Sequence, residues 1–117
     1  MTTIYKVYQC EYAQNETEDE RELRLQISCD GNINKGNTHL LKHVANVDAE
    51  CMTHAFEIMN LWDEPQRVEK LNERVTSLSV GNVLVDVDGV AWVVAGVGFE
   101  RVDCPIGADL PYYPICR

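Results

Sequence analysis

Two valine-rich segments separated by the dipeptide Asp88-Gly89 are the feature that most constrains the fold of this chain. Valine is enriched in β-strands because its branched side chain packs well on the pleated surface of a sheet. Asp-Gly is a favoured two-residue connection between antiparallel strands, since glycine tolerates positive φ angles. The sequence therefore predicts a β-hairpin with strands at 82–87 and 90–97.

Three earlier segments also have patterns typical of β-strands. Residues 4–9 combine aromatic with β-branched side chains. Residues 22–28 alternate polar and apolar side chains, which is the period of a strand with one buried and one solvated face. Residues 39–47 follow as a further strand, although part of this segment could instead be helical. The polar stretch 11–20 and the Gly- and Asn-rich stretch 30–37 are expected to be loops.

The main helix is expected at 48–62. Asp48 is a suitable N-cap, because its carboxylate can accept hydrogen bonds from the free backbone N–H groups of the first turn. Met52, Phe56 and Met59 then recur at helical spacing and form one apolar stripe. This stripe predicts that the helix packs one face against the rest of the protein.

A second, short helix is expected at 65–75, because Pro65 suits the first position of a helix. Together these segments predict an α+β fold, with a small antiparallel sheet of four to five strands and both helices packed on one face. The length of 117 residues is usual for one domain. We therefore expect a single domain at 1–103 and an irregular tail at 104–117 packed on it.

The sequence favours a cytoplasmic protein. No stretch is long and apolar enough to span a membrane, and the first residues lack the basic and apolar regions of a signal peptide. The five cysteines are irregularly spaced and form no Cys-x-x-Cys pair, so free thiols in a reducing compartment are expected. Cys104 and Cys116 are the one pair for which a disulfide is considered.

Negative charge is the most informative global property, because the formal net charge is −9. The residues from Glu11 to Glu22 contain six acids and one arginine, and the stretch 48–64 contains five acids without a lysine or arginine. Duplex DNA and anionic membranes bind clustered basic side chains. Direct binding of nucleic acid or membrane is therefore not expected.

The acidic run has two interpretations. It can be a solvated surface that keeps the protein soluble and discourages pairing of sheet edges. It can also be a docking surface for a basic groove, in which carboxylates take the place of phosphates. Trp62 is either a core residue or an interface anchor, since large aromatics dominate interface energies. The hypothetical partner-binding residues are Glu11, Glu16, Glu18, Asp19, Glu20, Glu22, Trp62, Asp63 and Glu64.

Two residue pairs are candidates for chemistry. His39 and His43 could share a metal ion on a helix but not on a strand, and leucine stands where a zincin motif has glutamate. Cys51 and His54 are three residues apart on the expected helix, but no orienting group or oxyanion hole is visible for a nucleophile pair. The alternative for all four is an ordinary structural role. No cofactor is expected.

Residues 76–85 and 88–99 resemble the YodL-like domain, an uncharacterised family met in phage, plasmid and other mobile-element proteins. The resemblance implies a mobile-element origin and no known activity. Asn82 stands in place of the family's usual aspartate, and Ala95-Gly96 in place of its usual Asp-Ser, so any polar role there does not carry over. The matching residues are Leu78, Ser79, Val80, Val83, Gly98 and Phe99.

The leading hypothesis is a non-catalytic acidic protein that binds a host protein with a basic surface and inhibits a nucleic-acid-binding defence complex. The first alternative is a small enzyme or metal-binding protein that uses Cys51 and His54 or the pair His39 and His43. The second alternative is an accessory domain that forms a homodimer or larger homo-oligomer through its sheet edge.

Overall fold

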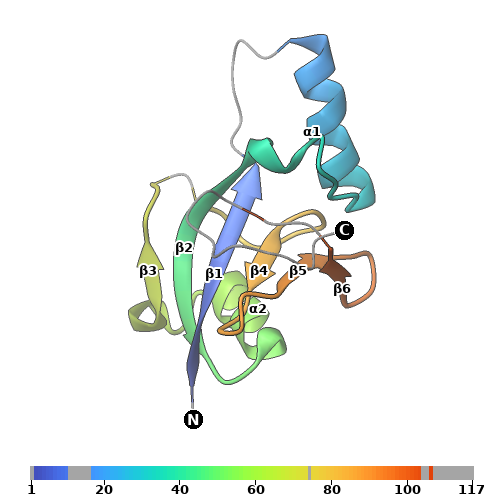
Figure 1. Cartoon of the computed structure of the whole chain (residues 1–117). Coiled ribbons are helices and arrows are strands. Elements are labelled where there is room, and N and C mark those ends of the chain that lie inside the picture. Colours follow the sequence, from blue (N-terminus) through green and yellow to red (C-terminus); the bar gives the residue numbers. More distant parts are fainter. Residues whose placement is uncertain (1, 11–16, 74, 104–105, 107–117) are drawn as a thin grey trace.

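A computed structural model describes residues 2–10, 17–73, 75–103 and 106, and shows a six-stranded antiparallel sheet with two α-helices (Figure 1). The α+β class is confirmed, and the sheet has more strands than the four to five predicted. The elements in chain order are β1 (Thr3–Cys10), α1 (Glu18–Asp30), a 3-10 helix (Thr38–Leu40), β2 (Leu41–Ala49), α2 (Met52–Leu61), a second 3-10 helix (Pro65–Arg67), β3 (Val68–Lys70), β4 (Val83–Val85), β5 (Ala91–Val94) and β6 (Phe99–Val102).

The strand order is β3-β2-β1-β4-β5-β6, so the first strand of the chain lies in the middle of the sheet. β1 pairs with β2 on one side and with β4 on the other, both antiparallel. β4, β5 and β6 form a meander of consecutive antiparallel strands. The connection from β3 to β4 therefore passes from one edge of the sheet, beyond β2 and β1, to the other half.

A β-bulge interrupts the pairing of β1 with β2. Val7 pairs with Ala45 and Tyr8 pairs with His43, so Val44 is the extra residue on β2. A bulge of this kind shifts the alternation of side chains by one position. Val44 and Ala45 are both buried in the same core as a result.

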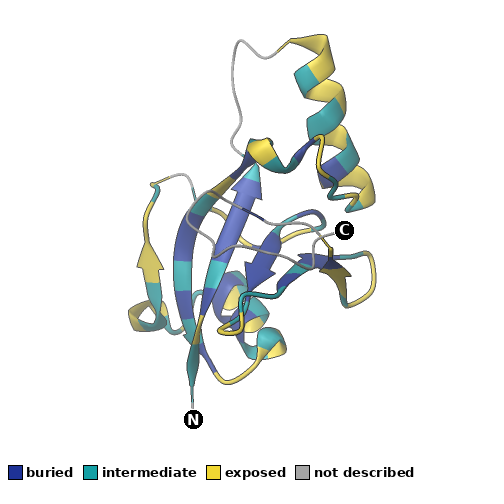
Figure 2. Ribbon diagram, viewed as in Figure 1, coloured by how far each residue is buried: buried dark blue, intermediate teal, exposed yellow. Residues whose placement is uncertain are grey.

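Two hydrophobic cores lie on opposite faces of the sheet, because alternate residues of the central strands belong to different clusters. Figure 2 shows the buried residues along the central strands of the sheet. The α2 helix covers the first face, where Val7 and Leu84 pack against Ile58 and Met59. The second core contains Ile27 of α1 together with Ile106, and the strand residues Tyr8, Leu41, Val83, Val85, Ala91, Val93 and Val102. Both faces of the sheet are therefore covered, rather than the single face that we predicted.

The predicted strand at 22–28 is wrong, because these residues belong to the helix α1. A capping box begins this helix: the Glu20 backbone N–H donates to Oγ1 of Thr17 (3.2 Å), and the Thr17 backbone N–H donates to Oε1 of Glu20 (3.2 Å). Gly31 ends the helix in the left-handed conformation, with φ of 64°. These terminal interactions outweigh the local alternation of polar and apolar residues.

The second predicted helix, at 65–75, is also wrong. Pro65–Arg67 form one 3-10 turn, and the chain then continues as the edge strand β3. Val68 of β3 pairs with Val47 of β2, and the Leu71 N–H donates to the carbonyl of the bulge residue Val44 (2.9 Å). The backbone groups of this segment therefore hydrogen-bond to the edge of β2, whereas in a helix they would hydrogen-bond to one another.

The main helix is shorter than the predicted range of 48–62. Asp48 belongs to β2 and pairs with Ile4, so it is not the N-cap. Cys51 occupies the N-cap position and makes no side-chain capping bond, while the Glu50 N–H donates to Nδ1 of His54 (3.1 Å). The predicted apolar stripe is confirmed, since Ala55, Ile58 and Met59 are buried with Met52 and Phe56 beside them.

The valine hairpin is confirmed, but its turn is wider and both of its strands are shorter than predicted. The Gly89 N–H donates to the Asp86 carbonyl (3.0 Å) and Gly89 has φ of 81°, which makes a three-residue connection around 87–89. Residues 95–98 form a second turn, which leads into the unpredicted strand β6. Within the predicted tail only Ile106 is described, and the remainder, including Cys104 and Cys116, lies outside the described residues.

Candidate functional site

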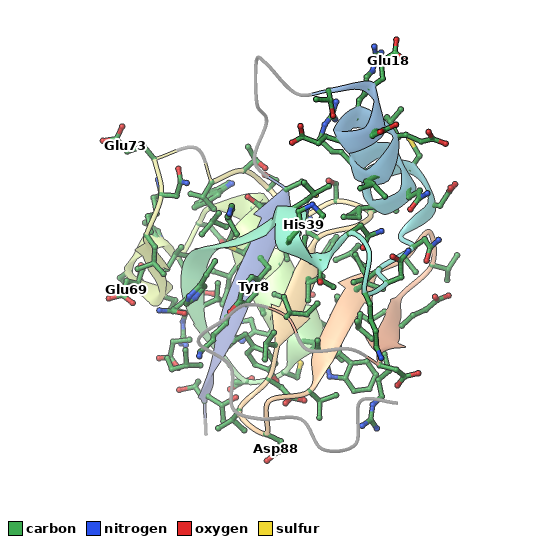
Figure 3. All side chains as sticks on the ribbon, turned by 45° about the horizontal axis from the view of Figure 1, so that its top comes forward. Tyr8, Glu18, His39, Glu69, Glu73 and Asp88 are labelled. Carbon is green, nitrogen blue, oxygen red and sulfur yellow. The ribbon has the colours of Figure 1, made fainter. Side chains whose placement is uncertain are left out.

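The structure places the N-terminal end of α1, which begins at Glu18, at the end of the molecule that is farthest from α2 (Figures 1 and 3). Glu18, Asp19 and Glu22 are exposed, whereas Glu20 is half-buried and takes part in the capping box. The helix contains five acids and two arginines, and none of its basic residues lies in its last turn. Glu11 and Glu16, the other two acids of the predicted run, lie outside the described residues.

Only the C-terminal half of α1 is held by the sheet. Ile27 is the one residue of this helix that is buried, and Leu25 is 40 % exposed. Figure 1 shows α1 standing above the end of β1, with its first turns away from the strands. The acids at the N-terminal end therefore lie on a projecting element that is anchored at its opposite end.

Trp62 is half-buried and contacts other side chains of the protein. It ends α2 with φ of 55°, which is a left-handed conformation that a bulky residue adopts at a cost. Its Nε1–H donates to Oγ of Ser77 (3.1 Å), and Nζ of Lys70 lies 5.0 Å from the ring centroid, which is the geometry of a cation–π contact. Asp63, which follows it, is exposed.

The carboxylate of Glu64 contacts two side chains of the protein itself, those of Arg67 and His54. Its Oε1 lies 3.0 Å from Nε of Arg67, and its Oε2 lies 3.4 Å from Nε2 of His54. The structure therefore does not bring the two groups of candidate acids together, since one lies on α1 and the other follows α2. Figure 3 shows carboxylates pointing outward on different sides of the molecule, including Glu18, Glu69, Glu73 and Asp88.

Cys51 and His54 do not form a nucleophile pair in this arrangement. Nδ1 of His54 accepts a hydrogen bond from the Glu50 N–H (3.1 Å), and its Nε2 faces the Glu64 carboxylate. A general base needs a ring nitrogen that can accept a proton from the thiol. Both ring nitrogens of His54 already have partners, so neither serves the exposed Cys51.

The histidine pair of the sequence is divided between two elements. His39 is exposed on the first 3-10 helix, whereas His43 lies on β2 and stacks on Tyr8, with ring centroids 5.0 Å apart. Nε2 of His43 lies 2.7 Å from Oδ1 of Asn46, and Nδ2 of Asn46 donates to Glu69 (2.7 Å). Across the described ranges, no three His, Cys, Asp or Glu residues are grouped so that they could hold a metal ion.

Sequence reasoning missed two side-chain amides that hold the segment 76–79 in place. Gln9 of β1 accepts from the Thr76 N–H (3.1 Å) and donates to the Thr76 carbonyl (2.9 Å). Asn60 of α2 accepts from the Leu78 N–H (2.6 Å) and donates to the Leu78 carbonyl (3.3 Å). Each amide thus satisfies both backbone groups of one loop residue, as a neighbouring strand would.

Together with Gln9 and Asn60, Asn82 forms a polar cluster along the segment 76–79. Asn82 also borders a cavity. Its Oδ1 accepts from the Ser79 N–H (2.9 Å) and from Nε2 of Gln9 (3.3 Å). The cavity, of about 200 Å³, lies between the end of β1, the C-terminal half of α1 and the segment 76–82. The sequence signal for this cluster was Gln9, a polar residue between Tyr8 and Cys10, and its side chain is only 5 % exposed in the structure.

No helix in the described portion of the chain is both long enough and apolar enough to cross a membrane. Comparisons of the chain with protein-family models, with curated proteins and with solved structures found no match.

Proposed function

We propose that this chain is a non-catalytic acidic binding protein of phage or mobile-element type, which acts in the cytoplasm and binds a host protein with a basic surface. The observation that carries this proposal is the placement of Glu18, Asp19 and Glu22, which are exposed at the projecting end of α1. The helix is anchored through Ile27 near its other end. This leaves the acidic end accessible to a partner.

Carboxylates in this arrangement favour a positively charged partner. Complementary charges raise the rate of association and select the partner, while like charges disfavour wrong partners. A groove that binds nucleic acid carries clustered Lys and Arg, and a helix of net charge −3, from five acids and two arginines, complements such a groove. A nucleic-acid-binding host defence complex is the target class that best fits this chemistry.

The resemblance of residues 76–85 and 88–99 to the YodL-like domain supports a mobile-element origin. The described contacts give less support to the alternatives. His54 has no ring nitrogen left for Cys51, which weakens the case for an enzyme at that pair. The edge strands β3 and β6 are short and carry charged side chains, which disfavours homo-oligomers formed by pairing of sheet edges.

The test is a pull-down from host lysate at low and high salt, with two variants of equal net charge. The first variant is Glu18→Lys/Asp19→Lys/Glu22→Lys on α1. The second reverses three exposed acids on other parts of the protein, Glu57→Lys/Glu73→Lys/Glu100→Lys.

We expect the native chain and the second variant to capture the same partner at low salt, and the α1 variant to bind it about tenfold more weakly or not at all. High salt should weaken binding of the native chain, because exposed charges are screened. Capture that is insensitive to salt, or that both variants lose equally, would contradict the proposed role of α1.

A further inference from the structure

β5 and β6 carry an aromatic surface on the face of the sheet against which α2 packs. Figure 1 shows α2 behind the middle of the sheet, whereas β6 is an edge strand. Cross-strand partners share one face of a sheet, so Trp92, which pairs with the core residue Leu84, lies on the α2 face. Arg101 of β6 pairs with Trp92 and lies on the same face. An indole and a guanidinium are therefore cross-strand neighbours here.

Two phenylalanines continue this surface toward α2. Phe99 lies two residues before Arg101, so both side chains are on the same face of β6. The ring of Phe99 meets the ring of Phe56, on α2, edge to face, with centroids 6.0 Å apart. Both rings are half-buried. We call the surface formed by Phe56, Trp92, Phe99 and Arg101 the aromatic face.

Trp92 is the member of the aromatic face that least resembles a core residue. It is half-buried, and neither hydrophobic core, as formed by the described residues, includes it. Its Nε1–H donates to Oδ2 of Asp86 (3.1 Å), which holds the indole in place. The side chain of Arg101 beside it is 54 % exposed. A tryptophan that is held in place outside the core, next to an exposed arginine, is typical of an interface, because these two residue types are enriched where binding energy is concentrated.

We propose that a second copy of this chain docks on the aromatic face and forms a symmetric dimer. A twofold contact places the same surface on both sides, so that surface must be complementary to itself. The aromatic face meets this requirement, because it holds both a cation and the ring that attracts a cation. Arg101 of one copy stacks on Trp92 of the other copy, and the reverse contact follows by symmetry. A basic partner fits this surface less well, since Arg101 repels it.

The charge of the whole chain opposes this dimer and predicts how the dimer depends on salt. Two copies of net charge −9 repel each other. Salt screens this long-range repulsion, whereas contacts buried between the two copies are screened much less. Higher salt should therefore strengthen the dimer, which is the opposite of its expected effect on the binding of a basic host protein. The dimer does not depend on that host protein, because it uses β5, β6 and α2 rather than the acidic end of α1.

The experiment is sedimentation equilibrium of the full chain at low and high sodium chloride. Protein concentrations extend up to about 1 mM, so that a weak dimer is also detected. Arg101→Glu is the main variant, and Arg21→Glu is its control because it makes the same charge change at an exposed arginine of α1. Glu100→Lys is a second control. Glu100 is exposed on the same strand, but it pairs with Val93 of the other core and so lies on the opposite face.

We expect the native chain and both controls to dimerise, and Arg101→Glu to dimerise at least about tenfold more weakly. Trp92→Leu should have a similar effect, with circular dichroism to confirm that this variant is folded. Dilution of the native chain should shift the backbone amide signals of residues 91–94 and 99–102. A native chain that stays monomeric at every concentration overturns the proposal, and so does a dimer that salt weakens.

The controls decide which surface is used. Equal weakening by Arg101→Glu and Arg21→Glu would mean that only the net charge matters. Equal weakening by Arg101→Glu and Glu100→Lys would indicate pairing along the edge of β6. Either result contradicts docking on the aromatic face.

Discussion

Gly81 lies directly against the backbone of Ile27, in the last turn of α1. A Cβ atom on Gly81 would be 2.1 Å from the Ile27 carbonyl oxygen and 2.7 Å from its carbonyl carbon. Gly81 also has φ of 91°, which side-chain-bearing residues rarely adopt, and its N–H donates to the Val94 carbonyl (2.9 Å). The contact between α1 and the sheet therefore requires glycine at this position.

Gly81→Ala should destabilise the protein by about 3 kcal/mol or more, because the new methyl group meets backbone atoms that cannot rotate away. Gly96→Ala is the matched control, since a Cβ there has nothing within 4 Å, and it should change stability by less than about 0.5 kcal/mol. Urea denaturation followed by circular dichroism measures both. Equal stability of the two variants would show that α1 does not pack against Gly81 as described.

The two-point contact between Asn60 and Leu78 should be a major support of the segment 76–79. Asn60→Leu leaves the N–H and carbonyl of Leu78 without this partner, and Leu78 is only 4 % exposed. We expect a loss of about 2–3 kcal/mol from two unsatisfied backbone groups. Asn60→Asp keeps the acceptor for the Leu78 N–H and should lie between the native chain and Asn60→Leu in thermal unfolding. The same loss in both variants would rule out a separate contribution from the acceptor.

Substitutions of Asp86 and Asp88 should change the stability of the protein by different amounts, although both residues lie at the hairpin turn. Asp86 accepts from the N–H groups of Asp88 (3.0 Å) and Val90 (2.9 Å) through Oδ1, and from Nε1 of Trp92 (3.1 Å) through Oδ2. Asp86→Asn sets an amide donor against the Trp92 N–H and should cost about 1–2 kcal/mol. Asp88→Asn makes the same charge change at an exposed position and should be within about 0.5 kcal/mol of the native chain.

Urea denaturation followed by tryptophan fluorescence compares these two variants. A larger effect of Asp88→Asn than of Asp86→Asn would contradict this role of Asp86.

Loss of the capping box should act locally on α1. Thr17→Ala removes the hydroxyl that accepts from the Glu20 N–H, which costs about 1 kcal/mol of helix stability. Since Ile27 is the helix's buried residue, we expect faster hydrogen exchange in the first turns and little change in the sheet. Thr17→Ser preserves the box and should exchange like the native chain. If Thr17→Ala accelerated hydrogen exchange in the sheet as much as in the first turns of α1, the capping box would instead support the whole fold.

Much of the sheet could be predicted because local pattern and tertiary packing agree there. The two cores bury aromatic and β-branched side chains from residues 4–9, from the strand within 39–47 and from the valine hairpin. β6 was not predictable in the same way, since its residues Phe99–Val102 include two exposed charged side chains between the half-buried Phe99 and the buried Val102. The turn before it depends on Gly98, whose φ of 71° reverses the chain.

The error at α1 has a specific physical cause. Leu23, Leu25 and Ile27 alternate as in a strand, but Leu23 and Ile27 are also four residues apart, which is the spacing of one helical face. Only the residues at the ends of this segment distinguish a helix from a strand. Thr17 followed three positions later by Glu20 is the sequence pattern of a capping box and would have indicated a helix.

The polar cluster beside the cavity could not be predicted from local sequence. Gln9 contacts Thr76, which lies 67 positions further along the chain, and Asn60 contacts Leu78, which lies 18 positions further. No periodicity encodes such a contact, because it depends on how β1 and α2 are placed by the sheet. The acidic residues of α1 were identified from sequence, but their separation from Trp62 and Glu64 depends on the same long-range arrangement.

The central position of β1 has a consequence for synthesis of the protein. During translation β1 leaves the ribosome before the other described elements, and one of its two hydrogen-bonding neighbours, β4, follows only after α1, β2, α2 and β3. Until then one edge of an apolar strand is open to pairing with other nascent chains. Contacts between segments far apart in sequence form slowly, so this interval favours aggregation of the newly made chain.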